Sequence, residues 1–293
     1  MSHQHLLPSC SMLFGVLCFA LASALMKVTA DSFSIFEIIF YRSLLGIFLT
    51  YALLKKANIS VQTNRPIAYV FRCLLGTTCI LLNVYAVWRL PLGTAQTLNY
   101  TAPLFFAVFL MLEAMYFHES ISRSLLLGTL IGFAGILLIA RPDIDPALAF
   151  PMAIGLFAGA CGAGGDWYIR YLTHRGEPGL RVVFYFVFAG TIAGLVGTCL
   201  TGFHSMDGIG AVQLAGIGIF GTLGQYAITY AWKNVAPILN CVYQYFGVVF
   251  ALIIGLLLFD DRLDTLTLCG IAVVCLSGIF ASIMTRRLEQ SRS

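Results

Sequence analysis

Amide, hydroxyl and phenol side chains recur at one spacing in three separate apolar stretches of the chain. The three sets are Gln96, Asn99, Tyr100 and Pro103; Thr222, Gln225, Tyr226 and Thr229; and Asn240, Tyr243, Gln244 and Gly247. Residues at i, i+3, i+4 and i+7 share one face of an α-helix, so each set forms a polar stripe. This chemistry favours an amino-acid-like, nucleoside-like or ring-bearing solute over a bare ion, although hydrogen bonds between helices also explain the stripes.

Two charged residues and one tryptophan extend this set of candidates. Arg42 lies about eight residues, roughly 12 Å, inside its apolar stretch; a charge at that depth costs about 2.5–3.5 kcal/mol and needs a partner. It either anchors a substrate carboxylate or serves as a gate charge, or it is a structural residue that bonds to backbone carbonyls or to Glu37. Asp166 either binds a proton or an amine, or pairs with Arg170 four residues later. Trp167 either stacks on a solute in a cavity or belongs to an interfacial belt.

No set of residues in the sequence has the spacing of a catalytic or metal site. The cysteines form no Cys-x-x-Cys pair and no His stands at ligand spacing from them. No Walker loop occurs, so ATP does not drive the protein directly. The one close carboxylate pair, Asp260 and Asp261, falls in a predicted outer loop. We therefore expect no catalytic residue, no metal ion and no cofactor, and a membrane enzyme is only a remote alternative.

The elements that must position these side chains are membrane helices. The 293 residues are 59% hydrophobic and 10% charged, with a mean hydropathy of +0.90, whereas soluble chains carry about 25% charged residues. The apolar blocks have the length that crosses about 30 Å of hydrocarbon. The net charge of +4 forms no basic stripe, so we expect a lipid bilayer and a small-molecule substrate as partners and no nucleic acid.

We predict ten spans, near residues 8–29, 34–54, 66–88, 93–116, 123–140, 148–171, 180–200, 208–231, 235–259 and 265–285. Glycines four residues apart, such as Gly190 and Gly194, predict close helix packing.

The two halves of the chain repeat one pattern. Phe117, Glu119 and Gly128 of the first half match Phe259, Asp261 and Gly270 of the second at one constant offset. Because five spans is an odd number, the second half must enter the membrane in the opposite sense. We predict an all-α integral membrane protein of ten transmembrane helices, arranged as two inverted five-helix repeats over residues 1–142 and 147–288. Such repeats place a substrate site near the midplane, at their interface.

Lysine and arginine counts predict the orientation. If the N-terminus is cytoplasmic, twelve of these residues fall on the cytoplasmic side, Arg65, Arg72 and Arg170 among them, and four fall on the other side. Cytoplasmic loops carry such an excess. We expect both termini in the cytoplasm and a multi-pass protein of the inner (plasma) membrane, either a monomer or a homodimer.

Several short motifs carry a resemblance to a known family. They are Phe40-Tyr41-Arg42, the run from Arg72 to Gly76, Tyr85-Ala86, Leu90-Pro91-Leu92, the run from Thr101 to Phe105, Glu119, and Gly128, Gly132 and Gly135 followed by Arg141-Pro142. Together they resemble the drug/metabolite transporter superfamily, specifically its ten-span EamA-type members. The second half departs from the pattern, with Tyr245 or Gly247 in place of a proline and Asp261 in place of glutamate. The resemblance implies a central cavity lined by both halves, and substrates such as amino acids and derivatives, S-adenosylmethionine, riboflavin, opine-like metallophores, sugars or drugs.

The hypothesis from the sequence is a secondary transporter that moves a small polar metabolite by alternating access, as an exporter. An importer or facilitative uniporter, of a metabolite such as S-adenosylmethionine or riboflavin, is the alternative. The expected substrate-binding residues are Gln96, Asn99, Tyr100, Trp167, Thr222, Gln225, Tyr226, Asn240, Tyr243 and Gln244, and the expected gating or charge residues are Arg42 and Asp166.

Overall fold

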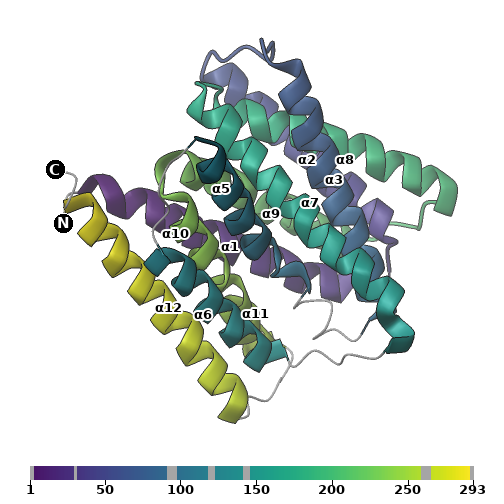
Figure 1. Ribbon diagram of the computed structural model, residues 1–293. Helices are drawn as coiled ribbons and strands as arrows, with labels where there is room; N and C mark the ends of the chain where they lie inside the picture. Colours follow the sequence, from purple (N-terminus) through teal and green to yellow (C-terminus); the bar gives the residue numbers. More distant parts are fainter. Residues whose placement is uncertain are drawn as a thin grey trace.

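The computed structural model describes residues 3–29, 32–90, 98–117, 123–140, 146–258 and 265–290, and throughout these ranges its regular structure is helical (Figure 1). The helices are α1 His3–Thr29, α2 Ile35–Lys56, α3 Pro66–Arg89, α5 Ala102–Phe117, α6 Arg123–Ala140, a 3₁₀ turn η1 Pro146–Leu148, α7 Ala149–His174, α8 Gly179–Thr201, α9 Gly208–Asn234, α10 Pro237–Gln244, α11 Phe246–Leu258 and α12 Thr265–Gln290. Gln96, Glu119, and Asp260 with Asp261 lie outside the described residues.

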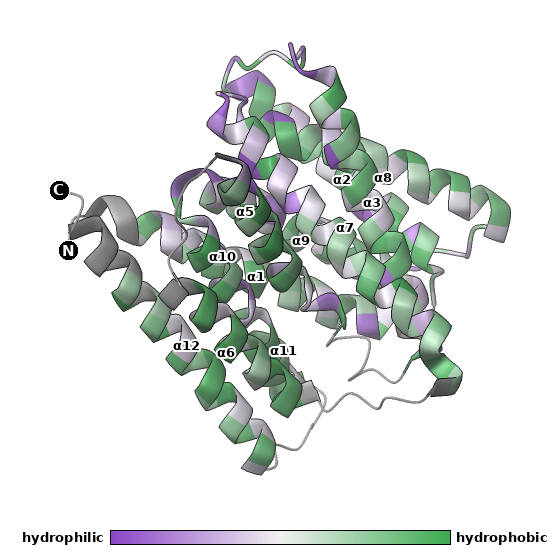
Figure 2. Ribbon diagram, in the orientation of Figure 1, coloured by the Kyte–Doolittle hydropathy of each residue, from purple (hydrophilic) through white to green (hydrophobic). Residues whose placement is uncertain are grey.

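Six helical segments of the described chain are long and apolar enough to cross a membrane. They are Leu7–Thr29, Ile35–Lys56, Pro66–Asn83, Gly179–Thr201, Gly208–Asn234 and Pro237–Leu258, and three shorter apolar helices cover Ala102–Tyr116, Leu126–Ile139 and Thr265–Ala281. α7 overlaps the predicted sixth span. The multi-span membrane class is confirmed, whereas the number ten stays a prediction. Figure 2 shows hydrophobic residues along most of the helices and hydrophilic residues gathered at the connection between α2 and α3.

The predicted ninth span is interrupted at Tyr245, where α10 ends and α11 begins. The Tyr245 N–H donates to the Val242 carbonyl at 3.2 Å, and the Val248 N–H donates to the Tyr245 carbonyl at 3.2 Å. Both bonds span three residues, which is the tighter 3₁₀ pattern and marks a local break in the α-helical ladder. The sequence did not predict this break, because no proline stands there.

The fourth span has a corresponding break. Leu98 and Asn99 are helical, a turn follows, and α5 begins at Ala102. Pro103 lies in the first turn of α5, where its missing N–H removes no helical bond. The Leu98 carbonyl accepts hydrogen bonds from both the Thr101 hydroxyl, at 2.6 Å, and the Thr101 backbone N–H, at 3.2 Å, so it is satisfied at the break.

The most extensive helix contacts pair α1 with α9, α3 with α7, α2 with α8 and α6 with α12. If each helix is replaced by its counterpart in the other half, the α1–α9 pair becomes the α7–α3 pair. The α2–α8 and α6–α12 pairs each consist of two counterparts and so map onto themselves. Along the α2–α8 contact, Gly197 lies against Phe36 and Gly190 against Ser43. Residue numbers therefore rise on α2 as they fall on α8, so these equivalent helices of the two halves are antiparallel.

Small residues bring the paired helices together. A Cβ added to Gly194 would lie 2.5 Å from the Phe40 nitrogen, and one added to Gly135 would lie 2.9 Å from the Gly270 carbonyl oxygen. Real side chains do not approach a backbone so closely. The close packing predicted at Gly190 and Gly194 is confirmed.

Candidate functional site

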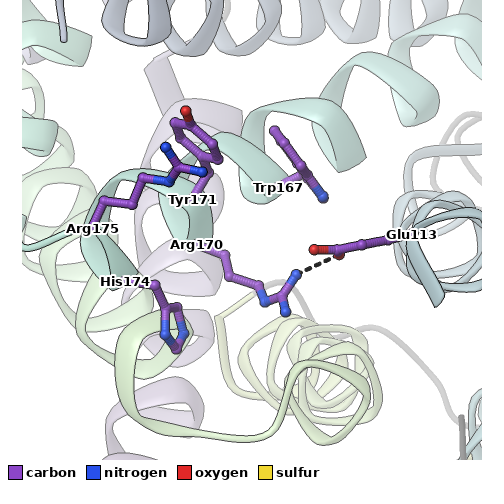
Figure 3. Close-up of a pocket in the computed structure, with 6 residues that line it drawn as sticks. All are labelled: Glu113, Trp167, Arg170, Tyr171, His174 and Arg175. Carbon is purple, nitrogen blue, oxygen red and sulfur yellow. Dashed lines mark hydrogen bonds and ion pairs between the residues drawn. The ribbon is translucent and has the colours of Figure 1, made fainter. Parts of the chain in front are cut away.

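A cavity of about 230 Å³ lies beside the C-terminal turns of α7, with α5 on its other side. Its lining residues are Glu113, Trp167, Arg170, Tyr171, His174 and Arg175. Figure 3 shows the side chains from the end of α7, with Arg175 from the residue directly after that helix, and Glu113 reaching toward them from α5. Residues three and four apart share a helix face, which is why so short a segment of α7 supplies most of the wall.

The Arg170 guanidinium joins the two helices that flank the cavity. Its Nη1 donates to Glu113 Oε2 at 2.7 Å, and both side chains are partly exposed. The Arg170 Nε is buried without a hydrogen-bond partner among the described residues. The alternative in which Arg170 pairs with Asp166 four residues away is therefore wrong, because the guanidinium is directed to a carboxylate on another helix.

Aromatic rings form another part of the cavity wall. Trp167 stacks on Tyr171 with ring centroids 5.3 Å apart and an interplanar angle of 22°. The Arg175 guanidinium lies 4.3 Å from the centroid of the Tyr171 ring, a cation–π distance. The cavity thus offers a flat aromatic surface next to the Arg175 guanidinium and the Arg170–Glu113 ion pair, a combination that suits a polar, ring-bearing molecule.

Asp166 lies one helical turn from Arg170, farther from the C-terminal end of α7. Its Oδ2 accepts a hydrogen bond from the side-chain nitrogen of Gln244 at 3.1 Å. Gln244 is the last residue of α10, directly before the break at Tyr245. The structure therefore brings together two of the predicted site residues, one from the sixth span and one from the ninth.

Arg72 is a residue that the sequence reasoning missed. It was counted with the cytoplasmic cations, but it lies in α3 and is only 4% exposed. Its guanidinium carbon is 4.2 Å from the centroid of the Phe186 ring, and a Cβ added to Gly165, the residue before Asp166, would lie 3.4 Å from its Nη1. The signal was present in the sequence, since Arg72 stands seven residues into the predicted third span.

The predicted stripes of the fourth and ninth spans meet at one point. A Cβ added to Gly247 would lie 3.1 Å from the Tyr100 hydroxyl oxygen. Asn99, which is exposed, accepts a hydrogen bond from the Asn83 side-chain nitrogen at 3.1 Å. Tyr243 is partly exposed and lies near Phe246, with ring centroids 6.5 Å apart. The side chains of Asn99 and Tyr243 are therefore accessible at the protein surface, although both residues come from the interior of predicted spans.

Other members of the predicted set are more enclosed. Thr222 and Gln225 are buried in α9, whereas Tyr226 is 40% exposed. The Asn240 side-chain nitrogen donates to the Ala231 carbonyl at 3.1 Å and so ties α10 to the end of α9. The Asn240 Oδ1 is buried without a partner among the described residues.

Arg42 lies beside Gly221 of α9 and is partly exposed. It forms no hydrogen bond or ion pair with any residue in the described part of the chain. The suggested partner Glu37 instead accepts hydrogen bonds from the backbone and ring nitrogens of His204, at 2.7 and 2.6 Å. The alternative in which Glu37 holds Arg42 is therefore wrong.

Comparison with known proteins gives consistent matches over both halves. The EamA-like transporter family model matches residues 6–141 and 149–283. An uncharacterized transporter of Helicobacter pylori (strain ATCC 700392 / 26695) is 30% identical over 93% of this chain and 96% of its own. The pseudopaline exporter CntI of Pseudomonas aeruginosa (strain UCBPP-PA14) is 27% identical over 88% of this chain and 91% of its own. A solved crystal structure superposes with a TM-score of 0.80 over 95% of this chain and 98% of that one, at 16% identity, which shows a likeness of fold alone.

Proposed function

Because the chain belongs to the EamA-like transporter family, we propose that it is a secondary transporter that exports a small polar metabolite by alternating access. The observation that carries this proposal is the hydrogen bond between Asp166 and Gln244, at the break of the ninth span, where the preceding Gly165 packs against Arg72. Charged groups inside a membrane bundle are costly, and those that are retained there mark substrate or ion pathways. Export is supported by the relative from Pseudomonas aeruginosa, which is an exporter by name.

The proposed architecture is ten spans in two inverted repeats, with boundaries near 1–142 and 147–288. The antiparallel packing of α2 on α8 supports this arrangement, since these helices occupy the same position in each half. The distribution of lysine and arginine supports cytoplasmic termini and an inner-membrane location. With that orientation, the C-terminal end of α7 faces the cytoplasm.

The cavity at the end of α7 is then the cytoplasmic entrance to the path. Trp167, on which a solute could stack there, directly follows Asp166 in α7. The breaks at Tyr245 and before Ala102 interrupt two neighbouring helices along the same route. Broken helices of this kind form the substrate sites of many secondary transporters, because they expose backbone groups next to a cavity. We retain Gln96, Asn99, Tyr100, Tyr243 and Gln244 as proposed contacts along this route.

The test is transport by the purified protein in proteoliposomes. We expect that vesicles loaded with a small-metabolite extract of the producing cells release particular compounds, detected by mass spectrometry, only when the protein is present. Release should saturate with concentration and show counterflow, which separates a carrier from a channel. Chemical conversion of a solute without movement across the membrane would contradict the proposal.

A further inference from the structure

One face of α7 is bonded to two other helices at positions a single helical turn apart. Asp166 and Arg170 are four residues apart, so their side chains lie on the same side of α7. The Asp166 Oδ2 accepts a hydrogen bond from the Gln244 side chain of α10 at 3.1 Å. The Arg170 Nη1 donates to Glu113 Oε2 of α5 at 2.7 Å (Figure 3). A short stretch of α7 therefore fastens two separate helices.

Each fastened helix is one half of a broken span. α5 starts at Ala102, directly after the break in the fourth span, and α10 ends at Gln244, directly before the break at Tyr245 in the ninth. α5 and α10 also pack against each other. α7 thus holds two neighbouring half-helices at once.

The two breaks lie next to each other and have the same hydrogen-bond geometry. The N–H groups of Thr101 and Tyr245 each donate to a carbonyl three residues earlier, at 3.2 Å in both cases. Such 3₁₀ bonds inside a longer helix often mark a hinge. A Cβ added to Gly247 would lie 3.1 Å from the Tyr100 hydroxyl oxygen, so residues beside the two breaks are in contact. α5 and α10 can therefore tilt about neighbouring points.

The ion pair that α7 makes with α5 is of a kind that opens easily. The Arg170 and Glu113 side chains are 26% and 32% exposed and line the cavity, so water reaches them. Ion pairs that water reaches contribute little stability. The Arg170 Nε is buried without a hydrogen-bond partner among the described residues, so opening the pair would let water satisfy one more donor. Glu177 makes the opposite kind of contact, because it is 8% exposed and accepts hydrogen bonds from three side chains.

We propose that the Arg170–Glu113 and Asp166–Gln244 bonds form a gate. Together they close one mouth of the transport path, and both break when α5 and α10 tilt away from α7 to admit substrate. This inference rests on the proposed transport function, and with the orientation proposed above the gate is at the cytoplasmic mouth. Arg170 and Glu113 then act by positioning helices and do not themselves hold the substrate.

The first experiment bridges the gate. The double variant Glu113→Cys/Arg170→Cys is reconstituted in proteoliposomes, and a short bifunctional methanethiosulfonate reagent joins the two introduced thiols, as intact-protein mass spectrometry verifies. We expect the bridge to lower protein-dependent release of metabolites by about tenfold or more, because a mouth that stays closed stops the transport cycle. Reduction with dithiothreitol should restore release.

The controls for the bridge are wild type and the two single-cysteine variants, treated alike. They show the effect of the reagent on the nine native cysteines and on each cavity position alone. Undiminished release by the bridged protein would overturn the gate and leave the transporter proposal intact. Absence of protein-dependent release by untreated wild type would overturn both.

Charge exchange then separates a gate from a substrate site. Glu113→Arg and Arg170→Glu each set like charges opposite one another and should impair release, whereas Arg89→Glu, at an exposed arginine of α3, should not. The exchanged pair Glu113→Arg/Arg170→Glu restores the attraction and should release metabolites within about threefold of wild type. If the two side chains bind substrate individually, the exchanged pair stays as impaired as the single reversals, and that result would overturn the inference. The exchanged pair keeps the ion pair, so a folding defect in a single reversal does not remove the test.

Discussion

Glu37 and Glu177 occupy opposite ends of the α2–α8 pair, and each ties a connection of one half to a connection of the other. Glu177 accepts hydrogen bonds from Thr63 at 3.0 Å and Tyr69 at 2.9 Å, which belong to the first half. Glu37 accepts hydrogen bonds from His204, which follows α8. Both carboxylates are buried. These hydrogen bonds therefore clamp the α2–α8 pair at both of its ends.

Replacing Glu177 by glutamine should destabilise the protein. The carboxylate also pairs with Arg181 at 2.6 Å, and both side chains are largely buried. Hydrogen bonds to charged groups contribute about 1.5–3 kcal/mol, so we expect a lower thermal unfolding midpoint in detergent. Tyr69→Phe removes one neutral donor and should lower the midpoint less. Equal midpoints for wild type and Glu177→Gln would contradict the clamp.

The same carboxylate predicts a pH dependence. Burial alone raises the pKa of Glu177, but the hydrogen bonds from Arg181, Tyr69 and Thr63 outweigh burial and leave that pKa below its usual value. The stabilisation is therefore fully present above the ordinary glutamate pKa of about 4.3 and is lost as pH falls through the lowered pKa. Unfolding midpoints of wild type and Glu177→Gln, measured from pH 7 to pH 3, should differ at the upper end and converge at the lower end.

Glycine-mediated packing makes a sharp prediction for Gly194. A Cβ there would lie 2.5 Å from the Phe40 nitrogen and 2.7 Å from its Cα, and backbone atoms cannot move aside as side chains do. Overpacking costs about 1–3 kcal/mol, so Gly194→Ala should unfold at a lower temperature than wild type. The matched control is Gly208→Ala, since nothing lies within 4 Å of a Cβ at Gly208. A neutral Gly194→Ala would argue against the antiparallel α2–α8 contact.

Hydropathy was sufficient to locate the helices, because a span must be apolar along its length whatever it packs against. It did not locate the partner of Arg170, because Glu113 lies 57 residues away in the chain and only tertiary packing brings them together. The break at Tyr245 was missed for a similar reason, since the usual signal is proline. Arg72 was misassigned because charge counting does not distinguish a residue at a span end from one that faces the interior.

Trp167 should contribute to substrate affinity through stacking. Aromatic pairs contribute about 0.5–1.5 kcal/mol beyond burial, which corresponds to as much as about a tenfold change in affinity. We expect Trp167→Ala to raise the KM for transport by up to about tenfold and Trp167→Phe to raise it less. Phe157→Ala is the control, because Phe157 is an exposed aromatic on the same helix. An equal loss in the Phe157 variant would indicate a general effect on α7.

The polar residues of the broken helices offer a test of the route itself. Asn99 is exposed and hydrogen-bonded to Asn83, and Tyr243 lies one residue before Gln244. Replacing either by leucine removes a hydrogen-bonding group from the proposed path but suits an apolar environment, so insertion into the membrane should be preserved. We expect Asn99→Leu and Tyr243→Leu to abolish uptake or release in proteoliposomes at wild-type protein levels. Leu156→Ala, a change at an exposed position of α7, should leave transport unaltered. Normal transport by both leucine variants would remove these residues from the path and restrict the site to Arg72, Asp166 and the cavity at the end of α7.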